Sequence, residues 1–394
     1  KSDGTVWAWG HANFKQLGNG VMDANGINIP VQVKGSDGVG YLSNIVDIAA
    51  IGEASFAIKS DGTLWSWGAN GEAGRGYENR NEYNYPFPFP YPVQVKDSAG
   101  TGFLTDVISI TGGGGSCTGI ALKSDGTVWA WGANQFGEVG QNYASATTEL
   151  LPLQVLGPNG VGYLTDVVYI GEGGEFSLAV KSDGTVWAWG WNAAGQLGNG
   201  TTVDKYSPVQ MPNFFDVVKI QGGGQHTLAI KSDGTLWAWG NNNYGSANCA
   251  GELYYGNGNC GFLGDGSADA YKTTPVQVKG PAGAGYLTDV IDIIAGGYMS
   301  GALKSDGTVW VWGNNSDGIL GNGTIVNSYY PVQVKDSNNI DYLTGIISFG
   351  NSNEEVVAIR SNGEIASWGQ NSLGQAGNGT YSSIMHTSLP GAIW

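Results

Sequence analysis

The stretch Lys-Ser-Asp-Gly-Thr-Val-Trp-Ala-Trp-Gly at residues 181–190 recurs along the whole chain. Self-similarity at a roughly constant period of tens of residues is the sequence signature of a repeat architecture. We therefore expect one structural unit, built seven times, with connections of variable length. The other copies open at Lys1, Lys59, Lys123, Lys231 and Lys304, and a divergent copy opens at Arg360.

Each copy is typical of a hairpin turn followed by a buried strand. Asp-Gly between two apolar runs favours a two-residue type I′ turn, because both central residues need a positive φ. After the turn, Val186 and Ala188 point to one face of the predicted strand, and Trp187 and Trp189 point to the other. Because both faces are apolar, we expect the strand to be covered on both sides.

Composition and charge exclude several classes of partner. The 394 residues include 17 Lys and Arg against 33 Asp and Glu, which gives a formal net charge of −16. Nucleic acids and anionic membrane surfaces are bound through basic residues, and the chain has no basic run, so we expect no nucleic-acid partner. No apolar run reaches the ~20 residues of a spanning helix, which predicts no membrane insertion.

Three further elements complete the repeated unit. A Pro-led strand follows each Trp strand, a composition that suits the edge of a sheet. A short apolar strand then runs into a Gly patch, as in residues 104–115, and a strand such as residues 227–230 leads into the next turn. Four short strands without a helical period predict a β-propeller blade, with the Gly-flanked strand innermost and the Pro-led strand outermost. A parallel β-helix is the alternative, but its repeats are much shorter.

The strand count is uneven. The first two strand types occur six times and the last two seven times, so residues 1–34 carry half a blade. We predict an all-β, seven-bladed propeller of four-stranded antiparallel blades, a single domain over residues 1–394. Closure would need two inner strands, supplied by a segment upstream of Lys1 similar to residues 217–230 or by a neighbouring molecule through self-association; otherwise the ring stays open. Complete blades are expected at residues 42–96, 104–155, 164–211, 214–278, 287–334 and 343–394.

Residues 222–240, Gly-Gly-Gly-Gln-His-Thr-Leu-Ala-Ile-Lys-Ser-Asp-Gly-Thr-Leu-Trp-Ala-Trp-Gly, resemble the regulator-of-chromosome-condensation repeat, as do residues 192–200. The resemblance covers nearly the whole chain and implies a seven-bladed propeller. Members of that family include a eukaryotic guanine-nucleotide exchange factor that binds chromatin, a bacterial inhibitor of β-lactamases, and repeats of large bacterial surface proteins. The Gly-rich, Lys-poor and Trp-dense repeats look most like the bacterial secreted branch.

The sequence contains no pattern that catalysis would need. His11, His226 and His386 have no metal-ligand spacing, and no Ser or Cys lies in a nucleophile-elbow motif. The Gly runs lack the Lys-Ser/Thr of a phosphate loop and lead into strands. We therefore expect no enzyme, no metal site and no cofactor. For His226, beside its Gly patch, we expect a structural hydrogen bond.

A group of acidic residues follows the Gly-flanked strands and is expected at one mouth of the central channel. Such a cluster could bind Ca²⁺ or a cationic side chain, since oxygen ligands suit hard cations. The alternative is a solvated acidic rim, because most charged residues are exposed. The candidates are Glu53, Glu172, Glu175, Glu354 and Glu355.

Two insertions are the candidate binding loops, because function usually lies in variable loops on a rigid scaffold. Their aromatic side chains are of the type enriched at protein contacts, and could also lie packed against their own blade. Cys249 and Cys260 bracket one insertion and suggest a disulfide, with two free thiols as the alternative; Cys117 is expected to be buried. The aromatic candidates are Tyr77, Tyr83, Tyr85, Phe87, Phe89, Tyr91, Tyr254 and Tyr255.

These observations favour a non-catalytic, extracellular or cell-surface adhesion propeller that binds a protein or a glycan through its loops. Three alternatives remain open at this point. They are a self-assembling surface-layer or filament subunit, an inhibitor of an enzyme, and an intracellular regulator similar to an exchange factor.

Overall fold

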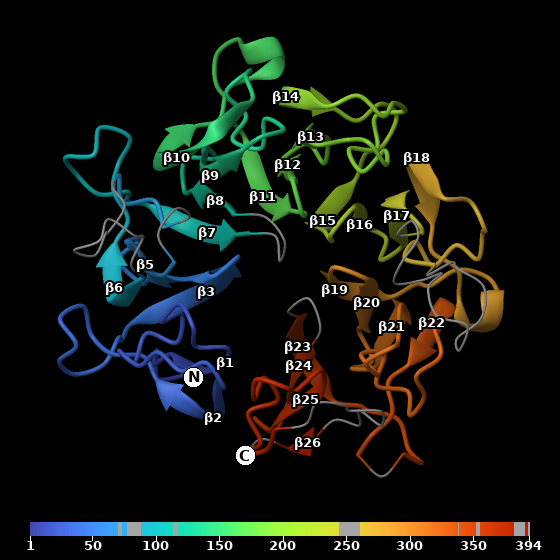
Figure 1. The fold of residues 1–394 in the computed structure, drawn as a ribbon. Coiled ribbons are helices and arrows are strands. Elements are labelled where there is room, and N and C mark those ends of the chain that lie inside the picture. Colours follow the sequence, from blue (N-terminus) through green and yellow to red (C-terminus); the bar gives the residue numbers. More distant parts are fainter. Residues whose placement is uncertain are drawn as a thin grey trace.

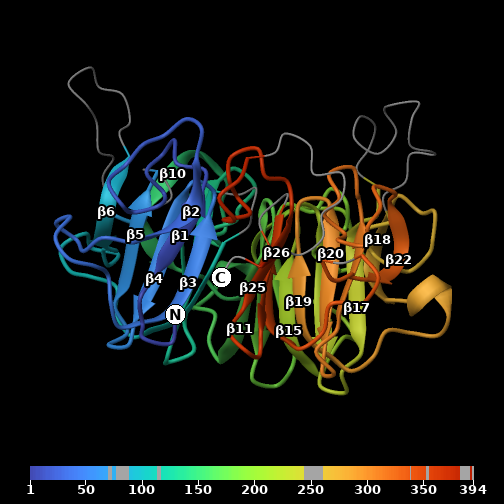
Figure 2. The same ribbon diagram turned by 90° about the horizontal axis from the view of Figure 1, so that it is seen from below.

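Six sheets of four antiparallel strands stand around a common axis, and a two-stranded sheet stands beside them at the N-terminus (Figure 1). The side view shows the sheets standing next to one another, with connections at both ends of the strands (Figure 2). The computed structural model describes all residues except 70–72, 77–87, 113–116, 244–260, 338, 352–354, 382–390 and 393–394.

The complete blades follow one another along the chain. The first contains β3 (Ile45–Ile51), β4 (Ala54–Lys59), β5 (Leu64–Gly68) and β6 (Phe89–Gln94); the second contains β7 (Val107–Thr111), β8 (Thr118–Lys123), β9 (Val128–Asn134) and β10 (Ser145–Gln154). The third contains β11 (Val167–Glu172), β12 (Phe176–Lys181), β13 (Val186–Gly190) and β14 (Lys205–Gln210).

The fourth blade contains β15 (Val217–Gly222), β16 (His226–Lys231), β17 (Leu236–Asn241) and β18 (Tyr271–Gln277). The fifth contains β19 (Val290–Ala295), β20 (Met299–Lys304), β21 (Val309–Gly313) and β22 (Ser328–Gln333). The sixth contains β23 (Ile346–Asn351), β24 (Glu355–Arg360), β25 (Ile365–Gly369) and β26 (Gly391–Ala392). Two short 3-10 turns, η1 (Pro158–Gly160) and η2 (Pro281–Gly283), lie in connections between blades.

The expected strand order is confirmed in each complete blade. In the third blade β11 pairs with β12, β12 with β13 and β13 with β14, so sequence order is also spatial order. The first strand of each blade lies nearest the axis (Figure 1), where it contacts first strands of adjacent blades. All of these pairings are antiparallel, which excludes the parallel β-helix.

The expected number of blades is wrong. The described residues form six four-stranded blades, not seven, because residues 1–34 contribute only β1 (Trp7–Gly10) and β2 (Ile27–Gln32). These two strands pair with each other and have no inner strands beside them. The two-stranded sheet nevertheless contacts both neighbours. Val6 shares a core cluster with Trp67 of the first blade, and Trp9 Nε1 donates to the carbonyl oxygen of Gln375, which follows β25, at 2.6 Å.

In the first five complete blades, the two tryptophans of the repeat have different environments. Trp189 is fully buried, and its Nε1 donates to the carbonyl oxygen of Glu138 in the preceding blade at 2.7 Å. Trp187 is half-buried, with the ammonium group of Lys181 5.0 Å from its ring centroid. A packed tryptophan removes roughly 150–250 Å² of surface from water, so the second tryptophan of each complete blade contributes a large part of the contact between blades. Val186 and Ala188, on the other face of the strand, are fully buried. The strand was expected to be covered on both faces, but the face that carries Trp187 is covered only in part.

The turn before each tryptophan strand is not the expected type I′ turn. The N–H of Gly184 donates to the carbonyl oxygen of Lys181 at 2.9 Å, and the N–H of Lys181 donates to the carbonyl oxygen of Thr185 at 3.0 Å. Only Gly184 has a positive φ, at 76°, so the hairpin has a three-residue loop with a bulged glycine. Asp183 Oδ1 accepts both the N–H and the hydroxyl of Thr185, at 2.9 and 2.6 Å, which explains the Asp and the Thr of the motif.

Candidate functional site

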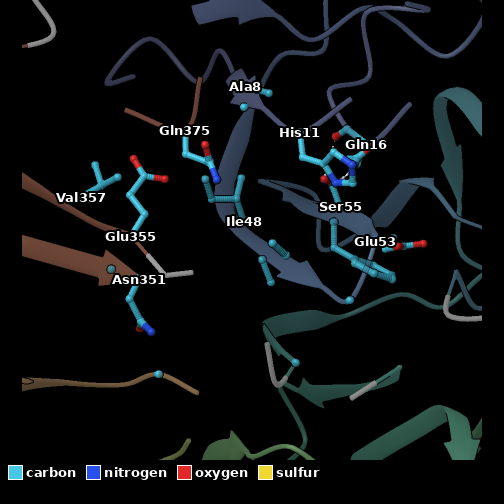
Figure 3. Close-up of a pocket in the computed structure, with 18 of the residues that line it drawn as sticks. Ala8, His11, Gln16, Ile48, Glu53, Ser55, Asn351, Glu355, Val357 and Gln375 are labelled. Atoms are coloured by element: carbon cyan, nitrogen blue, oxygen red, sulfur yellow. Dashed lines mark hydrogen bonds between the residues drawn. The ribbon is translucent and has the colours of Figure 1, made fainter. Parts of the chain in front are cut away.

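A cavity of about 740 Å³ lies where the two-stranded sheet has no inner strands. Its floor is β1, one wall is β3 with the start of β4, and the opposite wall is β24, as Figure 3 shows. At its inner end the cavity reaches the glycine-rich ends of β15 and β19 at the central axis. The cavity therefore lies between the first and sixth blades.

Glu355 projects into this cavity from the wall formed by β24 (Figure 3). The residue is only 7% exposed, and among the described residues its Oε1 has no hydrogen-bond partner. Burial raises the pKa of the Glu355 carboxyl well above its usual value, because a low-dielectric environment disfavours the charged form. A buried carboxylate oxygen without a hydrogen-bond partner is costly, and here the residue that carries it lines the cavity.

Of the other described acids that the sequence singled out, only Glu53 lines the cavity together with Glu355. Glu53 also lines the cavity, but it is exposed. Glu172, at the end of β11, is buried, and Glu175 is half-buried; neither lines the cavity. Burial raises the pKa of Glu175, with a smaller contribution from the charge of Asp204. Glu354 lies outside the described residues.

Sequence reasoning did not identify the polar groups that accompany Glu355 in the cavity. His11 Nδ1 and Gln16 Nε2 lie 3.1 Å apart on one side, and Gln375 lies on the other (Figure 3). The carbonyl oxygen of Gln375 already accepts the indole N–H of Trp9. The uneven number of strands could have indicated this site. Where residues 1–34 supply no inner strands, the residues of the neighbouring blades line a cavity.

The described aromatic candidates pack against their own scaffold. Phe89 is buried, and the guanidinium carbon of Arg75 lies 3.6 Å from its ring centroid. Tyr91 is half-buried, and its ring lies against the backbone at Gly20 and Gly38. The remaining candidates, Tyr77, Tyr83, Tyr85, Phe87, Tyr254 and Tyr255, lie outside the described residues, as do Cys249 and Cys260. Cys117 is exposed, so the expectation that it is buried is wrong; it precedes β8 and is not a strand residue.

His226 has the structural role that its position predicted. It is fully buried, its Nε2 lies 2.8 Å from Ser300 Oγ in the next blade, and its ring stacks on Phe262. Burial lowers the pKa of His226 to about 4. The imidazole is therefore neutral at physiological pH and links the fourth blade to the fifth.

Two further findings concern ligands and membranes. Within the described ranges, no group of three or more His, Cys, Asp or Glu side chains is placed so that it could hold a metal ion. In the same part of the chain, no helix combines the length and the apolar composition that crossing a membrane requires.

Comparison with known families identifies the repeat. The RCC1-like domain matches residues 1–252, and the regulator of chromosome condensation (RCC1) repeat matches residues 306–352. The chain belongs to the RCC1-like domain family. This RCC1-like chain is 27% identical over 396 residues to the E3 ubiquitin-protein ligase HERC2 of Homo sapiens, with 99% of the chain but only 7% of HERC2 covered. It is 25% identical over 379 residues to the ultraviolet-B receptor UVR8 of Arabidopsis thaliana, with 95% of the chain and 74% of UVR8 covered.

Solved structures show the same fold. The RCC1-like chain is similar to yeast RCC1 (Prp20) in its complex with Kap60, with a TM-score of 0.75 and 20% identity. The similarity covers 99% of this chain and 84% of Prp20. It is also similar to human WBSCR16, with a TM-score of 0.74, 19% identity, and 99% and 94% covered. The family expected from residues 222–240 is confirmed, whereas nothing in these comparisons indicates its bacterial secreted branch.

Proposed function

We propose that this chain is a non-catalytic regulatory propeller that acts by binding a protein partner. The observation that carries the proposal is the match of the RCC1-like domain to residues 1–252. Relatives of the chain are named as a ubiquitin ligase and as a light receptor, and yeast Prp20 is described in complex with Kap60 and as binding Gsp1p and histones. The chain spans 7% of HERC2, so the ligase activity of that protein is not carried over.

The relatives support a protein-binding regulator better than extracellular adhesion. The descriptions of two solved structures of yeast Prp20 name protein partners, namely Kap60, Gsp1p and histones. The intracellular regulator that the sequence left open as an alternative therefore becomes the main proposal.

Charge favours a basic partner. The chain has a formal net charge of −16 and a pI of about 4.4. Complementary charge accelerates association and suppresses wrong partners, and its contribution falls as salt screens the field. Among the partners named for yeast Prp20, histones are the basic ones, so they are the first proteins to test.

Binding of purified proteins to the immobilised chain tests this function. Histones, Gsp1p and an acidic protein of similar size would be measured by biolayer interferometry at about 50 mM and about 300 mM salt. We expect saturable binding of a basic protein that weakens at the higher salt, and no binding of the acidic control. Saturable binding of glycans on an array, with no protein bound at either salt concentration, would overturn the proposal.

A further inference from the structure

Three acidic side chains lie close together at the seam between the second and third blades. Glu138 follows β9, Glu175 precedes β12 and Asp204 precedes β14, so all three lie at the same end of the strands. Burial raises the pKa of Glu138, and the charges of Glu175 and Asp204 raise it further. Within the described residues, no Lys, Arg or His forms an ion pair with any of the three acids.

The hydrogen bonding of the loop does not require a charge on Glu138. Its Oε2 accepts the N–H of Phe136 at 2.8 Å. At the equivalent position of the third blade, Gln196 Oε1 accepts the N–H of Ala194 at 3.0 Å, so a neutral amide holds the same loop. Two further amides have this role, Gln16 in the two-stranded sheet and Gln375 in the sixth blade.

The other two acids also stand where other blades have amides. Asp204 Oδ1 accepts the N–H of Asn192 at 2.8 Å, and in the fifth blade Asn327 Oδ1 accepts the N–H of Asn315 at the same distance. Glu175 is the residue before β12, and in the fourth blade a Gln, at position 225, precedes β16. Because a carboxylate and a carboxamide have the same shape, the local structure does not explain why this seam carries three charges.

Two aromatic rings lie beside these acids. Trp191 and Phe136 are both half-buried, and their ring centroids are 5.8 Å apart. The backbone N–H of Trp191 donates to the carbonyl oxygen of Glu175 at 2.8 Å, which fixes the ring next to that acid. The other copies of the repeat have no Trp, Tyr or Phe at the position of Trp191; the residues there are His11, Ala69, Ala133, Asn241, Asn314 and Gln370.

Glu175 and Trp191 lack a hydrogen bond that the equivalent pair of the fourth blade has. There, Asn241 Nδ2 donates to Gln225 Oε1 at 2.6 Å, which satisfies the acceptor within the chain. In the third blade an indole ring replaces that amide, and no side chain of the described residues donates to the Glu175 carboxylate. A half-buried carboxylate beside an aromatic face is therefore available to a cation from outside the chain.

We propose that this seam is a binding site for an arginine side chain of a protein partner. The guanidinium group lies on the ring of Trp191 and donates to the carboxylates of Glu175 and Asp204, with the charge of Glu138 beneath them. A planar, weakly hydrated cation with five donors suits an aromatic face and two acceptors better than an ammonium group does. The inference deepens the proposed protein-binding function and rests on it, since it names the side chain by which a basic partner is recognised.

A peptide of eight arginines is the probe, and a peptide of eight lysines has the same charge for comparison. Calorimetry at about 150 mM salt, where the Debye length is about 8 Å, limits the contribution of distant charges. We expect saturable binding of the arginine peptide and clearly weaker binding of the lysine peptide. Equal affinity for the two peptides would show that charge alone is recognised and would overturn the assignment to arginine.

Restoring the amides tests the site without changing the shape of any side chain. The variant combines Glu138→Gln, Glu175→Gln and Asp204→Asn, residue types that other blades already carry at these positions. We expect the arginine peptide to bind at least about tenfold more weakly, because hydrogen bonds between charged groups are lost. The variant should unfold at the same or a higher temperature, since like charges have been removed, so weaker binding would not result from misfolding.

A control variant removes the same charge elsewhere at this end of the strands. It combines Asp265→Asn, Asp269→Asn and Asp317→Asn, in the loops that follow β17 and β21. Long-range attraction of a cationic peptide falls equally in both variants, so we expect the control to lose less than about threefold in affinity. Equal losses in the two variants, or no saturable binding by the unmodified chain, would overturn the inference.

The aromatic part of the site has its own test. Trp191→Ala should weaken binding of the arginine peptide about fivefold, as expected for a lost cation–π contact. Tyr271→Ala, which removes an exposed ring at the same end of the strands, should leave binding unchanged. Equal effects of these two changes would contradict the site. Histones that bind the amide variant as tightly as the unmodified chain would also contradict the arginine site, and would leave the proposed protein-binding function intact.

Discussion

Trp189 donates its indole N–H to the carbonyl oxygen of Glu138, 2.7 Å away in the preceding blade. The same carbonyl oxygen accepts the hydroxyl of Ser177 at 2.9 Å. The ring fills the space between two sheets while its one polar atom is satisfied by the neighbouring loop. Contacts of this kind make each blade a support for the next, so the repeated tryptophan stabilises the ring and not only its own strand.

Removal of Trp189 should therefore cost more than removal of Trp187 on the same strand. We expect Trp189→Ala to lower the free energy of unfolding by about 3–5 kcal/mol, the range for deletion of a buried aromatic side chain. Trp187→Ala should cost clearly less, because this ring is only half-buried. Urea denaturation followed by fluorescence measures both, and equal losses would show that packing between blades is not what makes the second tryptophan important.

His226 should make stability depend on pH below neutrality. Its pKa is about 4 in the folded state against an ordinary value of 6.5, so the unfolded chain binds more protons between these limits. Stability is therefore lost as the pH falls from about 6.5 toward 4, by roughly 3 kcal/mol at the lower limit. His226→Phe, which copies Phe176 at the equivalent position of the third blade, should remove this dependence. Melting temperatures from pH 7 to pH 4 test the difference, and parallel curves would contradict it.

Glu355 should have the opposite effect. Its pKa is raised in the folded state, so folding favours the protonated acid, and stability is lost as the pH rises above the ordinary value of 4.5 toward the folded pKa. Glu355→Gln removes the titration and retains a side chain of similar shape. We expect this variant to be more stable than the parent by about 1–3 kcal/mol at pH 8, because a neutral amide at this buried position costs less than an ionised carboxylate. The gain should shrink toward pH 5; thermal unfolding at both pH values measures it, and a destabilised variant at pH 8 would contradict it.

Two glycines of one loop should respond differently to the same substitution. Both have a positive φ, 67° at Gly198 and 81° at Gly200, so each should lose about 1–2 kcal/mol as alanine from the backbone conformation alone. A Cβ at Gly198 would also lie 2.5 Å from Met211 and 2.7 Å from Trp239, whereas a Cβ at Gly200 meets nothing within 4 Å. Gly198→Ala should therefore be the more destabilising change in urea denaturation, and equal losses would show that the core adjusts without cost.

Individual residues show how far the sequence predicts this structure. The four-strand blade and its order followed from the alternation in residues 181–190 and from the Pro-led and Gly-flanked segments, because strand periodicity and edge chemistry are local properties. The structural hydrogen bond of His226 was predicted from its place beside a Gly patch. The turn type was not, because Asp-Gly fits both a type I′ turn and a bulged three-residue loop, and only the bond from Gly184 to Lys181 decides between them.

By itself, the sequence determined the repeated unit, the family, and the fact that two inner strands are missing from residues 1–34. Only the tertiary structure decided that the ring has six complete blades, that Glu355 is buried beside a cavity, and that Glu172 and Glu175 are not part of that site. The physical reason is that strand formation depends on neighbours along the chain, whereas burial and cavity formation depend on which blades meet across the ring. Ile48 and Glu355 are far apart in the sequence, and only the arrangement of the blades places both of them at the same cavity.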